Sequence, residues 1–385
     1  MSQTDKPRSA PNPTASSADP IRPPILSTRP PNYDMFDGDE VHTSAELRQV
    51  VDYYRAKLTH IFDAADKKAL RHQHRHRMIA VAAAVFGTLA ILFGLLQLII
   101  PAGRLGGTTS APFAVIVSEV LAASFAVIAV GLGIRVALQR GWLVERHKAE
   151  RLRLLKFGAL IDPSLWSKIP GAMQAWQSGI ETKLAEIEAI DWKRLKDWAK
   201  GEPLPAYATA AETGLTAGEL AELVAYYHDR RLQFQFDYFT DRENRLDRWD
   251  RITREIGPLF FFVSILAVLI HFVYDLASEY LFHHEETTAA GHSSGLGMVS
   301  VVLILIAASL PVLSAGLRTV RGTYEFARNS IRFHAKRVAL NLLKERLKSE
   351  QDAKTVFYQL WVCEQVLESE HREWLRLMIE AEWFG

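Results

Sequence analysis

Four long stretches of apolar residues interrupt an otherwise polar chain. They cover about 78–100, 113–134, 258–276 and 296–317, and none carries the polar stripe every 3.6 residues that marks an amphipathic soluble helix. The first has 23 residues and no charge, so at about 1.5 Å per residue it reaches about 34 Å, against a hydrocarbon core of about 30 Å. The pattern predicts an all-α integral membrane protein with four transmembrane helices.

Short connections, roughly 101–112 and 277–295, join the spans in pairs, so the pattern predicts two hairpins. Lys and Arg crowd the other ends of the spans, whereas the two connections contain only Arg104. Cytoplasmic loops carry the excess of Lys and Arg in membrane proteins. Both termini and the long central segment are therefore expected on the cytoplasmic side.

A twelve-residue pattern recurs ahead of each hairpin. Thr43–Tyr54 and Thr216–Tyr227 are identical at six of twelve positions, including the Tyr-Tyr pair that ends each copy. Both open with Thr-x-x-Glu, which predicts a capping box at the start of a helix. The two halves would then share one membrane orientation, about a pseudo-two-fold axis along the membrane normal, which suits a pore or a symmetric bundle. Duplication for anchoring alone is the alternative.

The chain is expected to divide into four parts: a disordered Pro-rich tail over 1–41, a first hairpin repeat over 42–160, a cytoplasmic linker over 161–215, and a second hairpin repeat over 216–385. The tail prediction rests on eight of the sixteen prolines falling in the first 40 residues. Residues 220–254 are expected to form one continuous helix that leads into the third span. The final stretch, about 330–382, contains no helix breaker and predicts a C-terminal cytoplasmic helix. That helix either closes an intrachain bundle or forms an oligomerisation or sensor-docking surface.

Composition and motifs exclude several kinds of function and point to no catalytic site. Lys and Arg number 45 against 44 Asp and Glu, so the net charge of +1 gives no case for nucleic-acid binding. A single cysteine, Cys363, excludes an intrachain disulfide framework and multi-cysteine metal sites. Phosphate-binding loops, nucleophile elbows and His-Glu-x-x-His motifs are absent from the sequence. We expect no enzyme activity, no metal and no cofactor.

Glu119, inside the second span, is the candidate site residue that the sequence singles out. An unpaired carboxylate at membrane depth costs roughly 2–3 kcal/mol or more, so it should face protein or water. Gln97 lies at a similar depth on the first span, and His271 and Asp275 do so on the third. Glu119 could anchor neighbouring helices by a hydrogen bond, contribute to a ring of acids that favours cations in an oligomer, or reach to the outer interface.

Pro311 interrupts the fourth span, where it removes the backbone hydrogen bond to the carbonyl of Ala307. The resulting kink is expected to be either a gate hinge or a packing device. On the second span, overlapping small-x-x-x-small pairs predict close helix approach; they involve Ala122, Ala126, Ala129 and Gly133.

The architecture resembles the SMODS- and SLOG-associating two-transmembrane effector (SLATT) family of bacterial conflict proteins, apparently as a tandem duplication. The similar features are the Tyr-Tyr helix before a basic collar (Tyr53-Tyr54 and Tyr226-Tyr227), the hairpins with Arg-rich exits, and the closing Glu370–Leu375 motif. The resemblance covers about 42–385. The chain departs from the family pattern in carrying two hairpins where the single-domain pattern has one.

The resemblance implies a membrane effector of a bacterial defence system. It would sit in the bacterial inner membrane, form homo-oligomers in the lipid bilayer, and perforate or depolarise that membrane when a cytoplasmic, nucleotide-sensing partner triggers it. A function of another class stays open, namely a non-conducting membrane scaffold whose cytoplasmic helical bundle recruits a partner protein.

Overall fold

The structure, a computed structural model, describes residues 30, 32–37, 44–99, 110–135, 138–201, 213–282, 293–349 and 352–380. Within these ranges every regular element is helical. The elements are α1 (Ala45–Lys57), α2 (Thr59–Ile99), α3 (Ser110–Arg135), α4 (Leu138–Leu160), η1 (Pro163–Trp166), α5 (Ala172–Glu188), α6 (Trp192–Lys200), α7 (Ala217–Tyr227), η2 (His228–Gln233), α8 (Phe234–Phe282), α9 (Ser293–Tyr324), α10 (Phe326–Ser349) and α11 (Ala353–Glu380).

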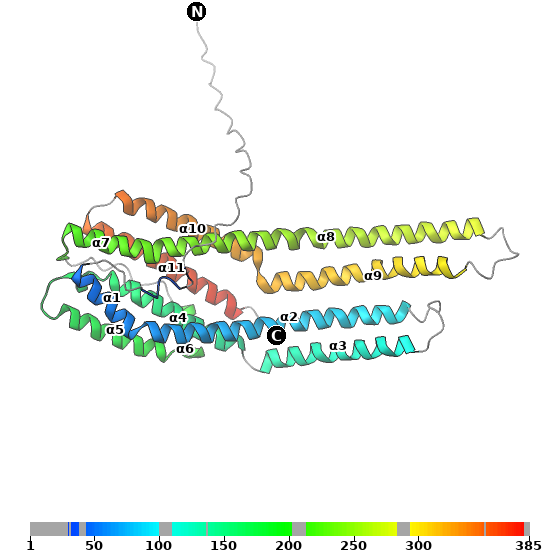
Figure 1. Cartoon of the computed structure of the whole chain (residues 1–385), viewed down its shortest axis with the longest axis horizontal. Helices are drawn as coiled ribbons and strands as arrows, with labels where there is room; N and C mark the ends of the chain where they lie inside the picture. Colours follow the sequence, from blue (N-terminus) through cyan, green and yellow to red (C-terminus); the bar gives the residue numbers. More distant parts are fainter. Residues whose placement is uncertain are drawn as a thin grey trace, which may run out of the picture.

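Four of these helices contain a segment long and apolar enough to cross a membrane, which confirms the number of spans predicted from the sequence. The segments belong to α2, α3, α8 and α9. Figure 1 shows them side by side at one end of an elongated molecule. The other helices, together with the polar halves of α2 and α8, form a second region that we call the polar bundle.

The membrane segments form a row and not a closed bundle. α2 packs against α3 on one side and α9 on the other, and α9 packs against α8 (Figure 1). Throughout the described part of the chain, extensive packing between these segments joins only neighbours in the order α3, α2, α9, α8. The row therefore ends in two edges, α3 and α8, each with one neighbouring span.

Small residues set the closest approaches in this row. A Cβ added to Gly316 of α9 would come within 2.8 Å of the Thr88 hydroxyl on α2, so the two helices meet at a position that requires glycine. On α3, the buried side chains of the span are Ala122 and Ala129, which face the helix pair and not the lipid. Small residues thus bring helices together within one chain.

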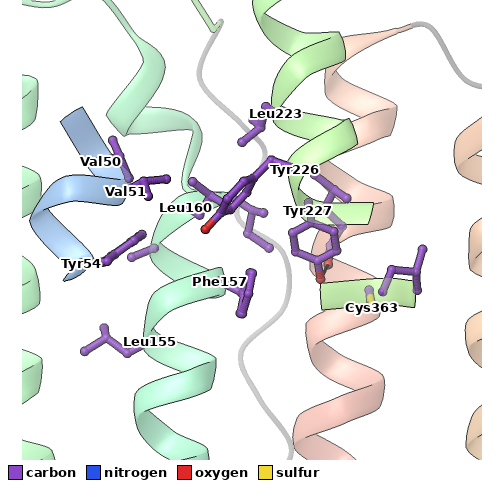
Figure 2. Close-up of a cluster of buried hydrophobic side chains, with 14 of the residues drawn as sticks. Val50, Val51, Tyr54, Leu155, Phe157, Leu160, Leu223, Tyr226, Tyr227 and Cys363 are labelled. Carbon is purple, nitrogen blue, oxygen red and sulfur yellow. Dashed lines mark hydrogen bonds between the residues drawn. The ribbon is translucent and has the colours of Figure 1, made fainter. Parts of the chain in front are cut away.

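The core of the polar bundle is built around α4. Figure 2 shows Phe157 and Leu160 of α4 between Tyr54 of α1 and the tyrosines of α7. The second tyrosine of each repeated pair is almost completely buried: Tyr54 is 1% exposed and Tyr227 is 0% exposed. The Tyr227 ring meets Phe157 edge-on, with ring centroids 5.8 Å apart. Tyr54 meets Trp176 of α5 edge-on, with centroids 5.4 Å apart. The Tyr-Tyr repeat therefore supplies core residues that hold α7 to α4 and α1 to α5.

The predicted capping box is present at one repeat and wrong at the other. At α7, Thr216 Oγ1 accepts from the Glu219 N–H at 3.3 Å, and Glu219 accepts from the Thr216 N–H at 2.6 Å. At α1 the N-cap is Ser44, whose side chain makes no capping bond, and Thr43 lies outside the described residues. The Ser44 N–H instead donates to Glu222 of α7 at 2.6 Å, so the other half of the chain satisfies this helix end.

The C-terminal stretch, about 330–382, is not one unbroken helix. It divides into α10 and α11, which pack against each other. Asp352 starts α11 because its carboxylate accepts from both the N–H (3.0 Å) and the hydroxyl (2.9 Å) of Thr355. An N-cap signal, rather than Gly or Pro, separates the two helices.

Part of the segment predicted to be a disordered tail is folded into the polar bundle. Residues 32–37, which we call the strap, form a turn in which Asp34 is 0% exposed and Met35 is 1% exposed. The prediction for these six residues is wrong because two acidic side chains and apolar neighbours find partners far away in the sequence. The residues before Pro30 lie outside the described part.

Candidate functional site

Glu119 is held within its own helix pair. The Gln97 side-chain amide on α2 donates a hydrogen bond to the Glu119 carboxylate on α3. Gly94 leaves room for this contact, because a Cβ there would lie 3.1 Å from Glu119 Oε1. The carboxylate is thus placed against α2, in the position of a helix-to-helix anchor.

His271 and Asp275 form a second polar group on the other helix pair. His271 Nδ1 lies 3.3 Å from Asp275 Oδ2, one turn along α8, and 3.2 Å from the Ser300 hydroxyl on α9. The structure therefore joins Gln97 to Glu119 and His271 to Asp275. The four predicted residues lie on separate helix pairs and do not converge on one site.

The Pro311 region is bonded sideways to α8. Because Pro311 has no N–H, the Ala307 carbonyl lacks its backbone donor, and the Ser264 hydroxyl of α8 donates to it at 2.7 Å. Ser314 of α9 returns the contact with a weaker bond to the Gly257 carbonyl at 3.4 Å. This geometry matches a packing device between α8 and α9.

The densest charged site of the described chain lies in the polar bundle, and the sequence analysis missed it. Arg231 forms a bidentate pair with Glu364 of α11, with Nε–Oε1 at 2.9 Å and Nη2–Oε2 at 2.8 Å. Its third nitrogen lies 3.5 Å from Asp34 of the strap. Arg231 and Glu364 are both buried, so α7–η2, α11 and the strap meet at one guanidinium.

Arg231 is placed by an irregular helical turn. The rod predicted as one helix over 220–254 is continuous, but it contains the π-helical turn η2 between α7 and α8. A π-turn inserts a residue into the helix, rotates the side chains that follow, and often occurs at functional sites. Here it places Arg230 and Arg231 against the strap, where the strap carboxylates lie.

The strap is held by a second cationic wall on α4. Lys156 Nζ donates to Asp37 Oδ2 at 2.7 Å and to the Asp34 carbonyl at 2.7 Å, and Arg153 Nε lies 3.3 Å from Asp34 Oδ2. The Tyr226 hydroxyl donates to Asp37 Oδ1 at 2.9 Å. Each strap carboxylate therefore contacts groups from both halves of the chain.

Burial and neighbouring carboxylates have opposite effects on the pKa values of Arg231 and Lys156. Burial opposes the charge on Arg231, but Glu364 and Asp34 outweigh it and raise the pKa of this guanidinium. For Lys156, burial dominates and lowers the pKa even though Asp37 favours the charged amine. The charged form of Lys156 is therefore stabilised by its two strap acceptors, the Asp34 carbonyl and the Asp37 carboxylate.

A neutral histidine pair lies next to this network. His147 Nδ1 of α4 is 2.9 Å from His371 Nε2 of α11, and both rings are buried beside Trp198. Burial lowers the pKa of His371 to about 3 and lowers that of His147 as well, with a further contribution from His371. One ring donates and the other accepts, so the pair joins α4 to α11 without charge.

Comparison with protein-family models, curated proteins and solved structures found no match to this chain. Functional inference therefore starts from the geometry of the membrane row, the strap and the ionic network.

The sequence carried a weak signal for the strap. Asp34 and Asp37 flank Met35-Phe36 in a tail otherwise rich in Pro, Ser and Thr, and such an acidic-aromatic cluster is unlike the rest of the tail. For Arg231, by contrast, the run His228–Arg231 resembles the solvated face of a polar helix. Only the π-turn reveals that this arginine points inward.

Proposed function

We propose that the protein is a membrane effector that oligomerises and perforates or depolarises the bacterial inner membrane when a cytoplasmic sensor triggers it. The observation that supports this most is the open row of spans. A row has no interior, so a conducting path requires several copies, with the α3 edge of one copy against the α8 edge of the next. The exposed apolar side chains on both edge helices suit such contacts.

Two continuous helices would carry the trigger to the membrane. α2 has 41 residues and α8 has 49, which at helical rise gives about 61 Å and about 74 Å. Their polar halves contribute Phe62 and Phe239 to the core of the bundle, where both are buried. A shift in the bundle would therefore move the ends of the first and third spans directly.

The Lys and Arg that flank the spans support a cytoplasmic position for the polar bundle and both termini. The repeated Tyr-Tyr entry supports two parallel hairpin repeats, since Tyr54 and Tyr227 are both buried in the core of the polar bundle (Figure 2). In this proposal the partners are the lipid bilayer, further copies of the chain and a cytoplasmic nucleotide-sensing protein. No enzyme chemistry, cofactor or nucleic acid takes part.

A non-conducting scaffold is the second candidate, and one observation favours it. Four intramembrane polar side chains are paired within the chain, Gln97 with Glu119 and His271 with Asp275. Groups that satisfy one another leave fewer polar atoms to line an ion path. In that case the polar bundle would recruit a partner protein and the spans would serve as an anchor.

Cross-linking together with ion flux separates the two functions. Val120 of α3 and Phe262 of α8 are exposed on the two edge helices of the row. They lie at similar depths, because the neighbouring contacts Gln97–Glu119 and Ser264–Ala307 are each nine residues away from the Thr88–Gly316 contact, along α2 and α9 respectively. The single native thiol does not interfere, because burial raises the pKa of Cys363 to about 12. Oxidation of the double variant Val120→Cys/Phe262→Cys in liposomes should give a ladder of oligomers, whereas each single variant should stop at a dimer or below.

The same liposomes, loaded with a potassium-sensitive dye, report conduction. Flux that appears with the oligomer ladder supports the effector. Oligomers without flux, in the presence and absence of the strap substitutions described below, would favour the scaffold. Absence of any ladder would contradict the proposed edge-to-edge assembly.

A further inference from the structure

The strap occupies a groove between the two halves of the polar bundle. One wall is α4, with Arg153 and Lys156, and the other is the π-turn, with Arg230 and Arg231. The side chains of all four cations are at most 12% exposed. A groove lined by four buried cations is costly to leave without anions.

The groove contacts the strap in the way that a peptide site contacts its ligand. Besides the two carboxylates, its cations bind main-chain carbonyl oxygens of the strap. Lys156 donates to the Asp34 carbonyl, and Arg55 donates to the Asp37 carbonyl at 3.2 Å. Arg230 donates to the Tyr33 and Phe36 carbonyls at 3.2 and 3.3 Å. Contacts to both backbone and side chains fix the register of the bound turn.

Apolar anchors complete the site. Met35 is 1% exposed in the hydrophobic core, whereas Phe36 is 39% exposed and its ring meets Phe62 of α2 edge-on, with centroids 6.0 Å apart. The Arg230 guanidinium lies over the Tyr33 ring, 3.9 Å from its centroid. The strap thus presents a short pattern of aromatic, acid, methionine, aromatic and acid, and each member has its own partner.

The strap also bridges elements that would otherwise lose partners. Both described acceptors of the Lys156 amine, the Asp34 carbonyl and the Asp37 carboxylate, belong to it. Asn32 adds a contact to Asp66 of α2 at 2.9 Å, so the strap touches the helix that leads into the first span. Its removal would leave Lys156 of α4 and Arg230 of η2 without their strap acceptors, whereas Arg153 would keep Glu150 and Arg231 would keep Glu364.

We propose that this groove is a recognition site for a short acidic peptide with aromatic and methionine anchors, occupied here by the chain's own residues 32–37. A partner protein that carries such a segment binds by displacing the strap. When the partner peptide replaces the strap, α4 separates from the π-turn. This movement is transmitted to the membrane spans along α2 and α8. This last step rests on the proposed function; the binding site does not.

The test measures binding of a fluorescein-labelled peptide with the sequence of residues 30–39 to the full chain in lipid nanodiscs, by fluorescence anisotropy. In the wild-type chain the tethered strap competes at high effective concentration, so the peptide binds weakly. The variant Asp34→Asn/Asp37→Asn weakens the resident strap and should bind the peptide at least tenfold more tightly. A peptide with the same two substitutions should not bind either protein.

A charge-matched control separates the groove from general electrostatics. Glu46→Gln/Asp197→Asn removes two exposed carboxylates, one from α1 and one from α6, and should bind the peptide as weakly as wild type does. Equal gain in both double variants, or no gain in the strap variant, would overturn the proposal.

Hydrogen exchange of the wild-type chain gives a result that does not depend on any variant. Backbone amides of residues 32–37 should be protected, and a saturating concentration of the unlabelled peptide should abolish that protection. Unchanged protection at saturation would overturn the exchange of strap and peptide. Since neither readout uses conduction, binding without any membrane effect would refute the proposed function and leave the recognition site in place.

Discussion

Arg231 and Glu364 share two hydrogen bonds of 2.9 and 2.8 Å between the π-turn and α11, in a region from which solvent is excluded. Three elements meet around this pair: the strap, α7 and α11. The Tyr227 hydroxyl donates to the same carboxylate at 2.6 Å, which ties the repeated Tyr-Tyr motif to the ionic network. The pair therefore joins three segments that are far apart in the sequence.

Breaking this pair should destabilise the protein strongly. Glu364→Gln removes the nearer of the two carboxylates that Arg231 faces, and breaking a buried ion pair costs about 3–5 kcal/mol. Thermal unfolding followed by tryptophan fluorescence in detergent should show a markedly lower midpoint. The matched control is Lys57→Met, which breaks the exposed pair with Glu181 and should cost about 1 kcal/mol or less. Equal shifts in the two variants would contradict the role assigned to Arg231.

The long uninterrupted apolar stretches were sufficient to predict the helices that could span a membrane, because about 20 apolar residues in succession have few other uses in a folded protein. The arrangement of the spans in a row could not be predicted from the sequence. It depends on Thr88 meeting Gly316 and on Gln97 meeting Glu119, which are contacts between residues that no local pattern relates.

The Ser264 hydroxyl should matter only because Pro311 is present. Ser264→Ala leaves the Ala307 carbonyl without a donor and should cost about 0.6–1.7 kcal/mol, the range measured for hydrogen bonds between membrane helices. In a Pro311→Ala background the α9 backbone supplies the missing donor, so the same substitution should cost much less. Thermal unfolding of the two single variants and the double variant completes the cycle. Additive effects would show that the two residues act independently.

Glu119 is expected to act as an anchor, so its charge should be dispensable. Glu119→Gln keeps an acceptor for Gln97 and should preserve both the oligomer ladder and the potassium flux. Glu119→Leu removes the acceptor and should weaken the α2–α3 pair, which a lower unfolding midpoint would reveal. If Glu119→Gln assembled normally but lost flux or changed its cation preference, the carboxylate would belong to the ion path instead.

The histidine pair should make stability depend on pH. Because the pKa of His371 is about 3 when folded and about 6.5 when unfolded, only the unfolded chain gains a proton as pH falls from 7 to 5. The stabilisation is thus complete above about pH 6.5 and falls by about 2 kcal/mol by pH 5.

His371→Phe should flatten this part of the pH profile in thermal unfolding. Glu370, whose pKa burial raises to about 7, acts in the opposite direction, but it is present in both proteins and cancels in the difference. A wild-type profile parallel to that of the variant between pH 7 and 5 would contradict the buried neutral pair.

The strap and its groove mark the limit of what the sequence could predict. A proline-rich composition describes most of the first 40 residues, and the signal from Asp34 and Asp37 is too short to outweigh it. Their burial becomes evident only when Lys156 and Arg231, from opposite halves of the chain, are seen to face them. The inward orientation of Arg231 in turn depends on one irregular helical turn.

In the proposed function, the polar bundle restrains a membrane-perforating assembly. The most direct test is membrane potential, read with a voltage-sensitive dye during titrated expression in a bacterial host. Asp34→Asn/Asp37→Asn is compared with the charge-matched Glu46→Gln/Asp197→Asn at equal membrane levels. We predict that the strap variant depolarises the cells and arrests growth where the control leaves them polarised. Polarised, growing cells with both proteins, although the strap variant is folded and binds the peptide, would contradict the account.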